Sequence, residues 1–123
     1  MKIISTQKAP AAIGPYSQAV VVGNLLFTSG QIAINPETAE VVSGGIAEQT
    51  EQIMKNLGEV LKAAGVGFEN AVKTTCFLAD IADFSVFNEI YGKYFTGKPA
   101  RSCVAVKDLP KGVLAEVEVI AEL

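Results

Sequence analysis

Histidine and tryptophan are absent from this chain of 123 residues, and arginine occurs once, as Arg101. Without histidine, the chain cannot form a Ser-His or Cys-His catalytic pair, and it lacks the commonest metal-binding side chain. The two cysteines, Cys76 and Cys103, are too few for a zinc site built on cysteines. No Walker loop and no GxGxxG motif is present. These absences exclude histidine-dependent hydrolysis and the common nucleotide-binding motifs.

Charge and hydrophobic runs narrow the class further. The formal net charge is -3 and no cluster of basic residues occurs, which argues against nucleic-acid binding. Hydrophobic residues make up 50% of the chain, too many for a disordered protein. No apolar run approaches the roughly 20 residues of a membrane span, and no signal peptide is recognisable. We expect one globular domain over residues 1–123, cytoplasmic, with apolar surface for a partner subunit.

Hydrophobic periodicity and turn residues predict an α+β fold. Strands are expected over residues 17–22, 25–34, 71–79, 100–107 and 113–122. Helices are expected between the glycine pair 44–45 and Gly65, and over residues 83–95. Their apolar stripes, at helical spacing, are Ile53, Met54, Leu57, Val60, Leu61 and Ala64 in the first helix and Phe84, Phe87, Ile90, Tyr91 and Tyr94 in the second. A hairpin turn is expected at residues 23–24, a further turn at 35–38, and a loop or hairpin at 108–112. This order favours a mostly antiparallel sheet with two helices on one face.

The other sheet face is expected to be covered as well. The strands are apolar enough that a neighbouring subunit is the economical cover for it. Residues 9–16 contain two prolines and a glycine, which is typical of an ordered but irregular segment. Gly58, in the middle of the first helix, indicates close packing against the sheet.

Arg101 is the first candidate functional residue. It lies at the start of a predicted strand, where a guanidinium suits a planar, bidentate partner such as a carboxylate. The alternative is an ordinary ion pair at a strand edge. Cys103 shares the face of Arg101, so the guanidinium could lower the pKa of its thiol. The alternative, which also applies to Cys76, is a small buried hydrophobic residue.

Glu116 and Glu118 alternate in the last predicted strand. They either form a solvated strand face or include one carboxylate that positions water or moves a proton. If the last two strands pair, Arg101 lies opposite Val119 and Glu116 points to the other face. A shared site for Arg101 and Glu116 then requires a bulge or a different partner strand.

Two segments near the N-terminus add candidate residues. The sequence Thr-Ser-Gly-Gln at residues 28–31 ends an apolar strand, and Gly30 allows a bulge or a close approach to a ligand. An ordinary strand end is the alternative. Tyr16 follows a Gly-Pro pair and supplies a ring and hydroxyl either to a pocket or to anchor the N-terminus.

These motifs together resemble the RidA/YjgF family. Its N-terminal signature is similar to Ala-Pro-Ala-Ala-Ile-Gly-Pro-Tyr-Ser-Gln-Ala at residues 9–19, and its second motif to Thr-Ser-Gly-Gln-Ile at 28–32. Its middle resembles residues 64–65 and 72–75, and its C-terminal signature resembles Pro-Ala-Arg-Ser-Cys-Val at 99–104, with residues 109–110 and 116–118 following. The match covers essentially the whole chain and looks like the archetypal RidA subgroup, which keeps the arginine.

The resemblance implies a chorismate-mutase-like subunit and a homotrimer with sites in the clefts between subunits. It implies hydrolysis of reactive 2-imino and enamino acids to 2-keto acids and ammonia. The substrates would be 2-aminoacrylate, 2-iminobutanoate and 2-iminopropanoate, which PLP-dependent dehydratases release. No metal or organic cofactor is implied, and the activity would protect PLP enzymes from enamine damage.

The resemblance also assigns roles to individual residues. Arg101 matches the residue that binds the substrate carboxylate, and Glu116 matches the one that positions the attacking water. The remaining substrate-binding positions are Tyr16, Ser29, Gly30 with its backbone donor, Asn88, and the backbone carbonyl of Cys103. Many relatives carry several more residues, including an aromatic one, just before Pro-Ala-Arg. Here the short segment 95–99 places Lys98 next to Pro99, which leaves the size and side-chain preference of the pocket open.

Two other functions remain as alternatives. A non-catalytic trimer that senses a small carboxylate would use the same pocket and Arg101. A ribonuclease or translation inhibitor, an activity also attached to this family, is disfavoured by the net negative charge, the single arginine and the missing histidine.

Overall fold

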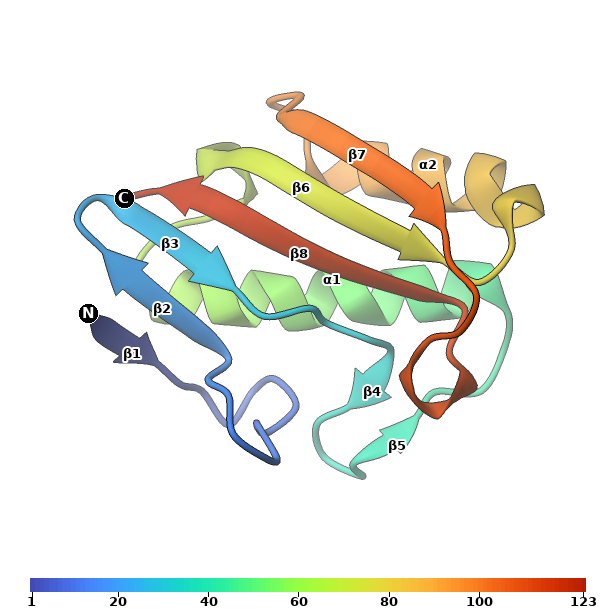
Figure 1. The fold of residues 1–123 in the computed structure, drawn as a ribbon, viewed down its shortest axis with the longest axis horizontal. Helices are drawn as coiled ribbons and strands as arrows, with labels where there is room; N and C mark the ends of the chain where they lie inside the picture. Colours follow the sequence, from blue (N-terminus) through green and yellow to red (C-terminus); the bar gives the residue numbers. More distant parts are fainter.

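A six-stranded sheet carries both helices of the protein on one face (Figure 1). The computed structural model describes residues 1–123. The sheet has the order β1-β2-β3-β8-β6-β7 and contains β1 (Lys2–Ile4), β2 (Ala19–Val22), β3 (Leu25–Thr28), β6 (Ala71–Leu78), β7 (Ala100–Ala105) and β8 (Ala115–Glu122). The helices are α1 (Ile46–Ala63) and α2 (Phe84–Tyr94), and β4 (Ile34–Asn35) pairs with β5 (Glu40–Val41) in a separate ribbon.

The predicted α+β class is confirmed, with one parallel pair in the sheet. All neighbouring strands of the sheet are antiparallel except β6 and β7, which run parallel because α2 connects them. No helix combines the length and the apolar character that a membrane span requires.

The N-terminal strands differ in part from the prediction. The hairpin between β2 and β3 is confirmed, with Gly23 at φ 61° in the turn. The strand predicted over 25–34 is interrupted: β3 ends at Thr28, Gln31 makes only an isolated bridge to Val117, and Ile34 begins β4 of the separate ribbon. β1 was not predicted: three residues are too short to show a periodicity, and they pair as an edge strand with β2.

Helix α1 follows its predicted apolar stripe. Ile53, Leu57 and Leu61 are fully buried on this stripe. Gly45 caps the N-terminus, and Gly65 at φ 81° ends the helix as predicted. The expectation that Gly58 packs on the sheet is wrong: a Cβ there would lie 3.2 Å from the ring of Phe68, in the 3-10 turn Phe68–Asn70.

The last two strands are not neighbours in the sheet. β6 lies between them, pairing parallel with β7 and antiparallel with β8. Residues 108–112 therefore form a loop with a short 3-10 turn at Pro110–Gly112 rather than a hairpin. Long-range pairing inserts this strand, and no local pattern in the sequence signals it.

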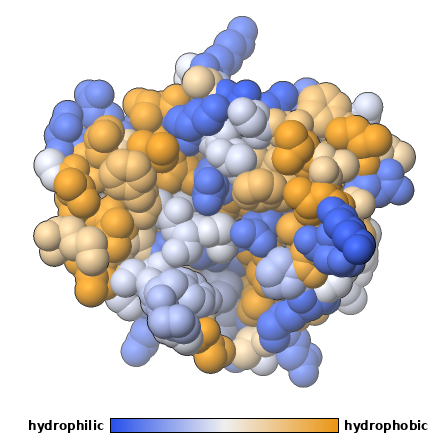
Figure 2. Space-filling model, viewed as in Figure 1, coloured by the Kyte–Doolittle hydropathy of each residue, from blue (hydrophilic) through white to orange (hydrophobic).

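The sheet has one covered face and one open face. The covered face packs on α1 and α2 and carries the buried side chains of the central strands, such as Cys76, Val117 and Leu26. The open face carries exposed apolar residues at Val22 and Phe27. Figure 2, which looks at this face, shows apolar groups separated by polar side chains. No helix of the chain covers this face.

Candidate functional site

Arg101 lies on the covered face of β7, at the edge of the sheet beside α2. Its Nη1 donates a 2.7 Å hydrogen bond to Oδ1 of Asn88. Its Cζ lies 4.7 Å from the ring centroid of Tyr91 and 5.5 Å from that of Phe84. The alternative of an ordinary ion pair is wrong within the chain, because the guanidinium pairs with no carboxylate. The remaining N–H groups are therefore free for an external anion.

The two cysteines face each other beside Arg101. Cys76 and Cys103 are paired in register on β6 and β7, and both are free thiols. Burial raises the pKa of the half-buried Cys103, although Arg101 opposes the shift. Burial and the neighbouring Cys103 raise the pKa of Cys76 to about 12. Both side chains are neutral thiols at neutral pH, so the suggestion of a reactive, low-pKa Cys103 is not supported.

Glu116 and Gly30 meet on the open face of the sheet. Phe27 lies opposite Ile120, whereas Gln31 lies opposite Val117, so four steps on one strand match three on β8. This extra residue is the bulge that Gly30 was predicted to allow. A Cβ on Gly30 would fall within bonding range of the Glu116 carboxylate, so only glycine leaves room for that side chain.

The carboxylate of Glu116 is half-buried and has no hydrogen-bond or ion-pair partner within the chain. Burial is the main cause that raises its pKa, and the negative charge of Glu118 adds to the shift. The backbone N–H of Gly30 also donates no hydrogen bond within the chain. A carboxylate of raised pKa beside a free N–H is suited to hold a water molecule and exchange a proton.

The N-terminal segment places Ser29 and Tyr16. The Ser29 hydroxyl donates a 2.5 Å hydrogen bond to the carbonyl of Ser17, which ties this segment to the bulge. Tyr16 is 54% exposed, so it does not anchor the N-terminus. Gln18 does this instead: its buried side chain accepts from Thr6 N and donates to three backbone carbonyls of the segment.

The predicted residues therefore form two clusters. The arginine cluster contains Asn88, Arg101 and Cys103 and lies on the covered face at the β7 edge. The carboxylate cluster contains Ser29, Gly30 and Glu116 and lies on the open face at the bulge. Tyr16 is next to Ser17, whose carbonyl accepts the hydrogen bond of Ser29 in the second cluster.

The separation of the clusters follows from the register. Arg101 is level with Thr74, and Thr74 with Val119, so all three side chains point to the covered face. Glu116 lies opposite Phe77 and points to the open face. The strand β6, inserted between β7 and β8, does not bring Arg101 and Glu116 to one face. A single chain thus does not assemble both groups around one small molecule.

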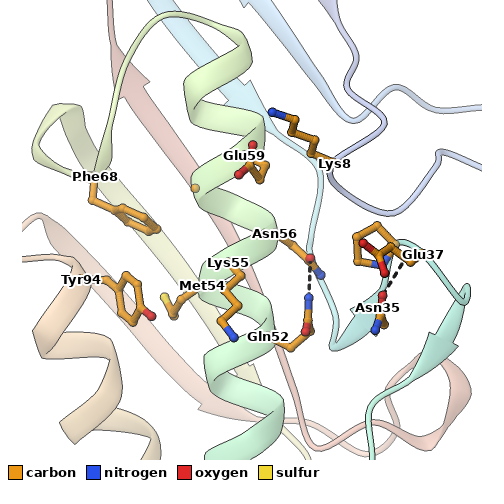
Figure 3. Close-up of a pocket in the computed structure, with 12 residues that line it drawn as sticks. Lys8, Asn35, Glu37, Gln52, Met54, Lys55, Asn56, Glu59, Phe68 and Tyr94 are labelled. Atoms are coloured by element: carbon orange, nitrogen blue, oxygen red, sulfur yellow. Dashed lines mark hydrogen bonds between the residues drawn. The ribbon is translucent and has the colours of Figure 1, made fainter.

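A cavity of about 460 Å³ beside α1 contains none of the predicted residues. Figure 3 shows Phe68 and Tyr94 on one flank of α1 and Lys8 and Asn35 on the other, so the hollow extends across the helix. Asn56 in it donates to the carbonyls of residues 32 and 34, which fastens that segment to α1. We assign this region a structural role.

Sequence reasoning missed three residues that surround Arg101. Phe84 and Tyr91 were assigned only to the apolar stripe of the second helix, and Thr74 was not singled out. Tyr91 and Thr74 share a buried hydrogen bond of 2.7 Å. Phe84 and Tyr91 lie four positions before and three positions after Asn88, on the apolar stripe of the helix. This spacing predicts that both rings are buried and does not indicate that they contact an arginine.

Comparisons with known proteins identify the family of this chain. A model of the family described as endoribonuclease L-PSP matches residues 6–123. A Rattus norvegicus protein named 2-iminobutanoate/2-iminopropanoate deaminase is 57% identical over 98% of this chain and 88% of its own length. The Arabidopsis thaliana protein named Reactive Intermediate Deaminase A, chloroplastic, is 52% identical over 99% of this chain and 66% of its own length.

A solved structure extends the likeness to three dimensions. The crystal structure of E. coli TdcF with bound serine has a TM-score of 0.94 and 42% identity, and the match covers 100% of this chain and 99% of that one. The resemblance inferred from the motifs is confirmed. The chain belongs to the L-PSP family, which is the YjgF/RidA family.

Proposed function

We propose that this protein hydrolyses small 2-imino acids, such as 2-iminobutanoate and 2-iminopropanoate, to 2-keto acids and ammonia. The observation that carries the proposal is the Arg101 guanidinium, which Asn88 holds in place and which no carboxylate of the chain neutralises. It occurs in a chain 57% identical to a protein named 2-iminobutanoate/2-iminopropanoate deaminase. A small 2-imino acid offers one carboxylate and one C=N bond for recognition. A guanidinium edge is the strongest available partner for that carboxylate.

The reaction needs water placement and proton transfer more than a strong nucleophile. Water adds its oxygen to the carbon of the protonated C=N bond, and Glu116 accepts one proton from that water. The same carboxyl group returns the proton to nitrogen, and then takes the proton of the new hydroxyl group as the C–N bond breaks. Ammonia and the 2-keto acid leave, and the proton on Glu116 passes to solvent or to ammonia. The raised pKa of Glu116 suits this exchange, because a group that titrates nearer neutrality gives and takes a proton more readily. The Gly30 N–H and the Cys103 carbonyl are the proposed polar contacts to the substrate.

The active site is proposed to form between two copies of the chain. One copy supplies the arginine cluster, and its neighbour supplies the carboxylate cluster with Tyr16. Three observations support this assignment: the clusters lie on opposite sheet faces, the carboxylate of Glu116 is unpartnered, and apolar Val22 and Phe27 are exposed on the same open face. A homotrimer, with a chorismate-mutase-like arrangement of the sheets, would cover that face and complete three sites. The expected setting is the cytoplasm, where dehydratases release these imines.

Purified protein coupled to a threonine dehydratase tests the activity. We expect the release of 2-ketobutyrate to accelerate in proportion to added protein, because the dehydratase supplies 2-iminobutanoate faster than water hydrolyses it. The control omits the dehydratase and adds threonine alone. An unchanged rate, with 2-ketobutyrate bound in calorimetry, would instead favour a non-catalytic carboxylate-binding protein.

Mixing two inactive variants tests the shared site. Subunits carrying Arg101→Ala and subunits carrying Glu116→Gln are each expected to be inactive alone. After unfolding and refolding together in equal amounts, about a quarter of the sites of a cyclic trimer should combine an intact Arg101 with an intact Glu116. Turnover should return to about that fraction of wild type. If both residues act within one chain, mixing restores nothing, and the inter-subunit site is wrong.

A further inference from the structure

We propose that the ring of Tyr91 positions the Arg101 guanidinium so that its free edge faces the substrate carboxylate. Tyr91 does not touch the substrate in this proposal; it acts through Arg101. The inference rests on the proposed function, since it assumes that Arg101 binds a small carboxylate, and it adds a residue to that site.

Tyr91 is fixed before any ligand arrives. Its hydroxyl and that of Thr74 share a 2.7 Å hydrogen bond, and Thr74 is fully buried on β6. Its ring stacks on Phe95 with the centroids 4.5 Å apart and is tilted against Phe87 at 5.9 Å. The Tyr91 residue is 7% exposed. Burial raises the pKa of Tyr91, so the ring stays a neutral phenol and brings no negative charge to the guanidinium.

The guanidinium lies against this ring and is held at one end. Cζ of Arg101 is 4.7 Å from the Tyr91 centroid, closer than the 5.5 Å to Phe84. The ring face attracts the cation through its quadrupole. Asn88 takes one hydrogen bond from Nη1, so two contacts from α2, one to an amide and one to a ring, restrict the rotation of the guanidinium plane. The N–H groups away from Asn88 remain free.

A fixed guanidinium plane matters because the substrate is small. A bidentate pair needs both N–H bonds in the plane of the carboxylate, and a mobile arginine side chain loses rotamer freedom when it adopts that plane. Tyr91 and Asn88 remove part of this cost in advance. The register places Thr74 on β6 directly opposite Arg101 on β7. The hydroxyl group that holds Tyr91 is therefore beside the arginine that Tyr91 positions.

The test measures the binding of 2-ketobutyrate, a stable 2-oxo carboxylate, by calorimetry on the full-length protein, with KM and kcat measured in parallel. We expect Tyr91→Leu to weaken binding and raise KM about 2- to 30-fold, the range that a cation–π contact supports. We expect kcat to change by less than about twofold. The carboxylate contact is the same in the ground state and the transition state, so its loss raises KM and leaves kcat nearly unchanged. Tyr91→Phe keeps the ring and should recover most of the affinity.

Tyr94→Leu is the matched control. Tyr94 lies on the same helix, and its hydroxyl also donates a 2.7 Å hydrogen bond, to Glu51, but its ring packs on Phe68 and does not contact Arg101. We expect this variant to bind 2-ketobutyrate as wild type does. Equal losses in the Tyr91→Leu and Tyr94→Leu variants would reduce Tyr91 to a packing residue and overturn the proposal, as would wild-type binding in Tyr91→Leu.

A ring of altered charge distribution keeps the test decisive if Tyr91→Leu does not fold. Pentafluorophenylalanine at position 91 has nearly the shape of phenylalanine, but its fluorines withdraw the negative charge from the ring face. We expect it to bind 2-ketobutyrate more weakly than the Tyr91→Phe variant does; equal affinity overturns the proposal. If the wild-type protein binds 2-ketobutyrate through Arg101 but turns over no 2-iminobutanoate, the proposed deaminase activity is refuted. The affinities of the variants at position 91 then still decide whether Tyr91 positions Arg101. Wild-type protein that binds no 2-ketobutyrate refutes both.

Discussion

Replacing Arg101 by alanine is expected to lower kcat/KM for 2-iminobutanoate by about thirty- to several-thousand-fold, while the assembled protein stays folded. The truncation removes a charged, hydrogen-bonded contact in a partly dry cleft, which contributes roughly 2–5 kcal/mol. Each step of about 1.4 kcal/mol is a factor of ten in the rate. The fold should survive, because Arg101 is only partly buried and its one side-chain hydrogen bond goes to the exposed Asn88. Coupled hydrolysis measures the loss, with circular dichroism and sizing as the folding checks.

Two further variants separate geometry from charge. Arg101→Lys should recover only part of the activity, because an ammonium keeps the charge but loses the planar fork. Lys107→Ala removes an exposed positive charge just beyond β7 and should act like wild type. Wild-type turnover in a folded Arg101→Ala protein would end the proposed mechanism. Equal losses for Lys107→Ala and Arg101→Ala would show that only the overall charge matters.

The sequence showed which residues of one strand share a face, but not how the faces of two strands relate. Strand parity is a local property: residues two apart share a face whichever strand pairs with them. The expectation that Glu116 points away from the face of Arg101 assumed that the last two strands pair, and β6 separates them. The two residues lie on opposite faces because of the register of β6 with each neighbour, which the sequence does not show. The insertion itself depends on contacts between distant segments, and the turn residues at 108–112 are equally compatible with a hairpin.

The contacts that organise the site were harder to predict. Gly30 indicated a bulge, because a glycine at a strand end is a recognised signal. The residue pattern alone could not identify its partner Glu116, since 86 positions separate them (116 minus 30); only the family resemblance assigned both to one pocket. Gln18 has no distinguishing sequence feature, although its buried amide holds the whole N-terminal segment. In each case the deciding interaction is long-range and polar, and such pairs leave no periodic trace.

Tyr91 illustrates a second limit. The helical stripe correctly predicted that this ring is buried. The same spacing hid its contact with Arg101, because a core aromatic and an aromatic that supports an arginine occupy the same stripe positions. The residue pattern thus predicted which face of the helix is buried, and only the structure showed that this face also contacts Arg101.

Replacing Glu116 by glutamine is expected to lower kcat about 100-fold or more, the usual range for losing a positioned acid–base group. Glutamine keeps the size of the side chain beside Gly30 but cannot accept a proton from water. The affinity for 2-ketobutyrate should survive, because Arg101 supplies that binding. Near neutral pH the variant should be at least as stable as wild type. Burial raises the pKa of Glu116, so its ionised form costs stability once the pH rises through that pKa.

Glu118→Gln is the matched control, since Glu118 lies two residues further on the same open face and is exposed. Its turnover should stay within about threefold of wild type, because an exposed carboxylate near the site acts only through its charge. The pH profiles give an independent check. The kcat of wild type should fall as the pH is lowered through the raised pKa of Glu116. Glu118→Gln should move this fall to lower pH, because the charge of Glu118 contributes to the raised pKa. Glu116→Gln should lack it. Equal losses of turnover in both variants, or an unchanged acid limb in Glu116→Gln, would assign the proton transfer to another group.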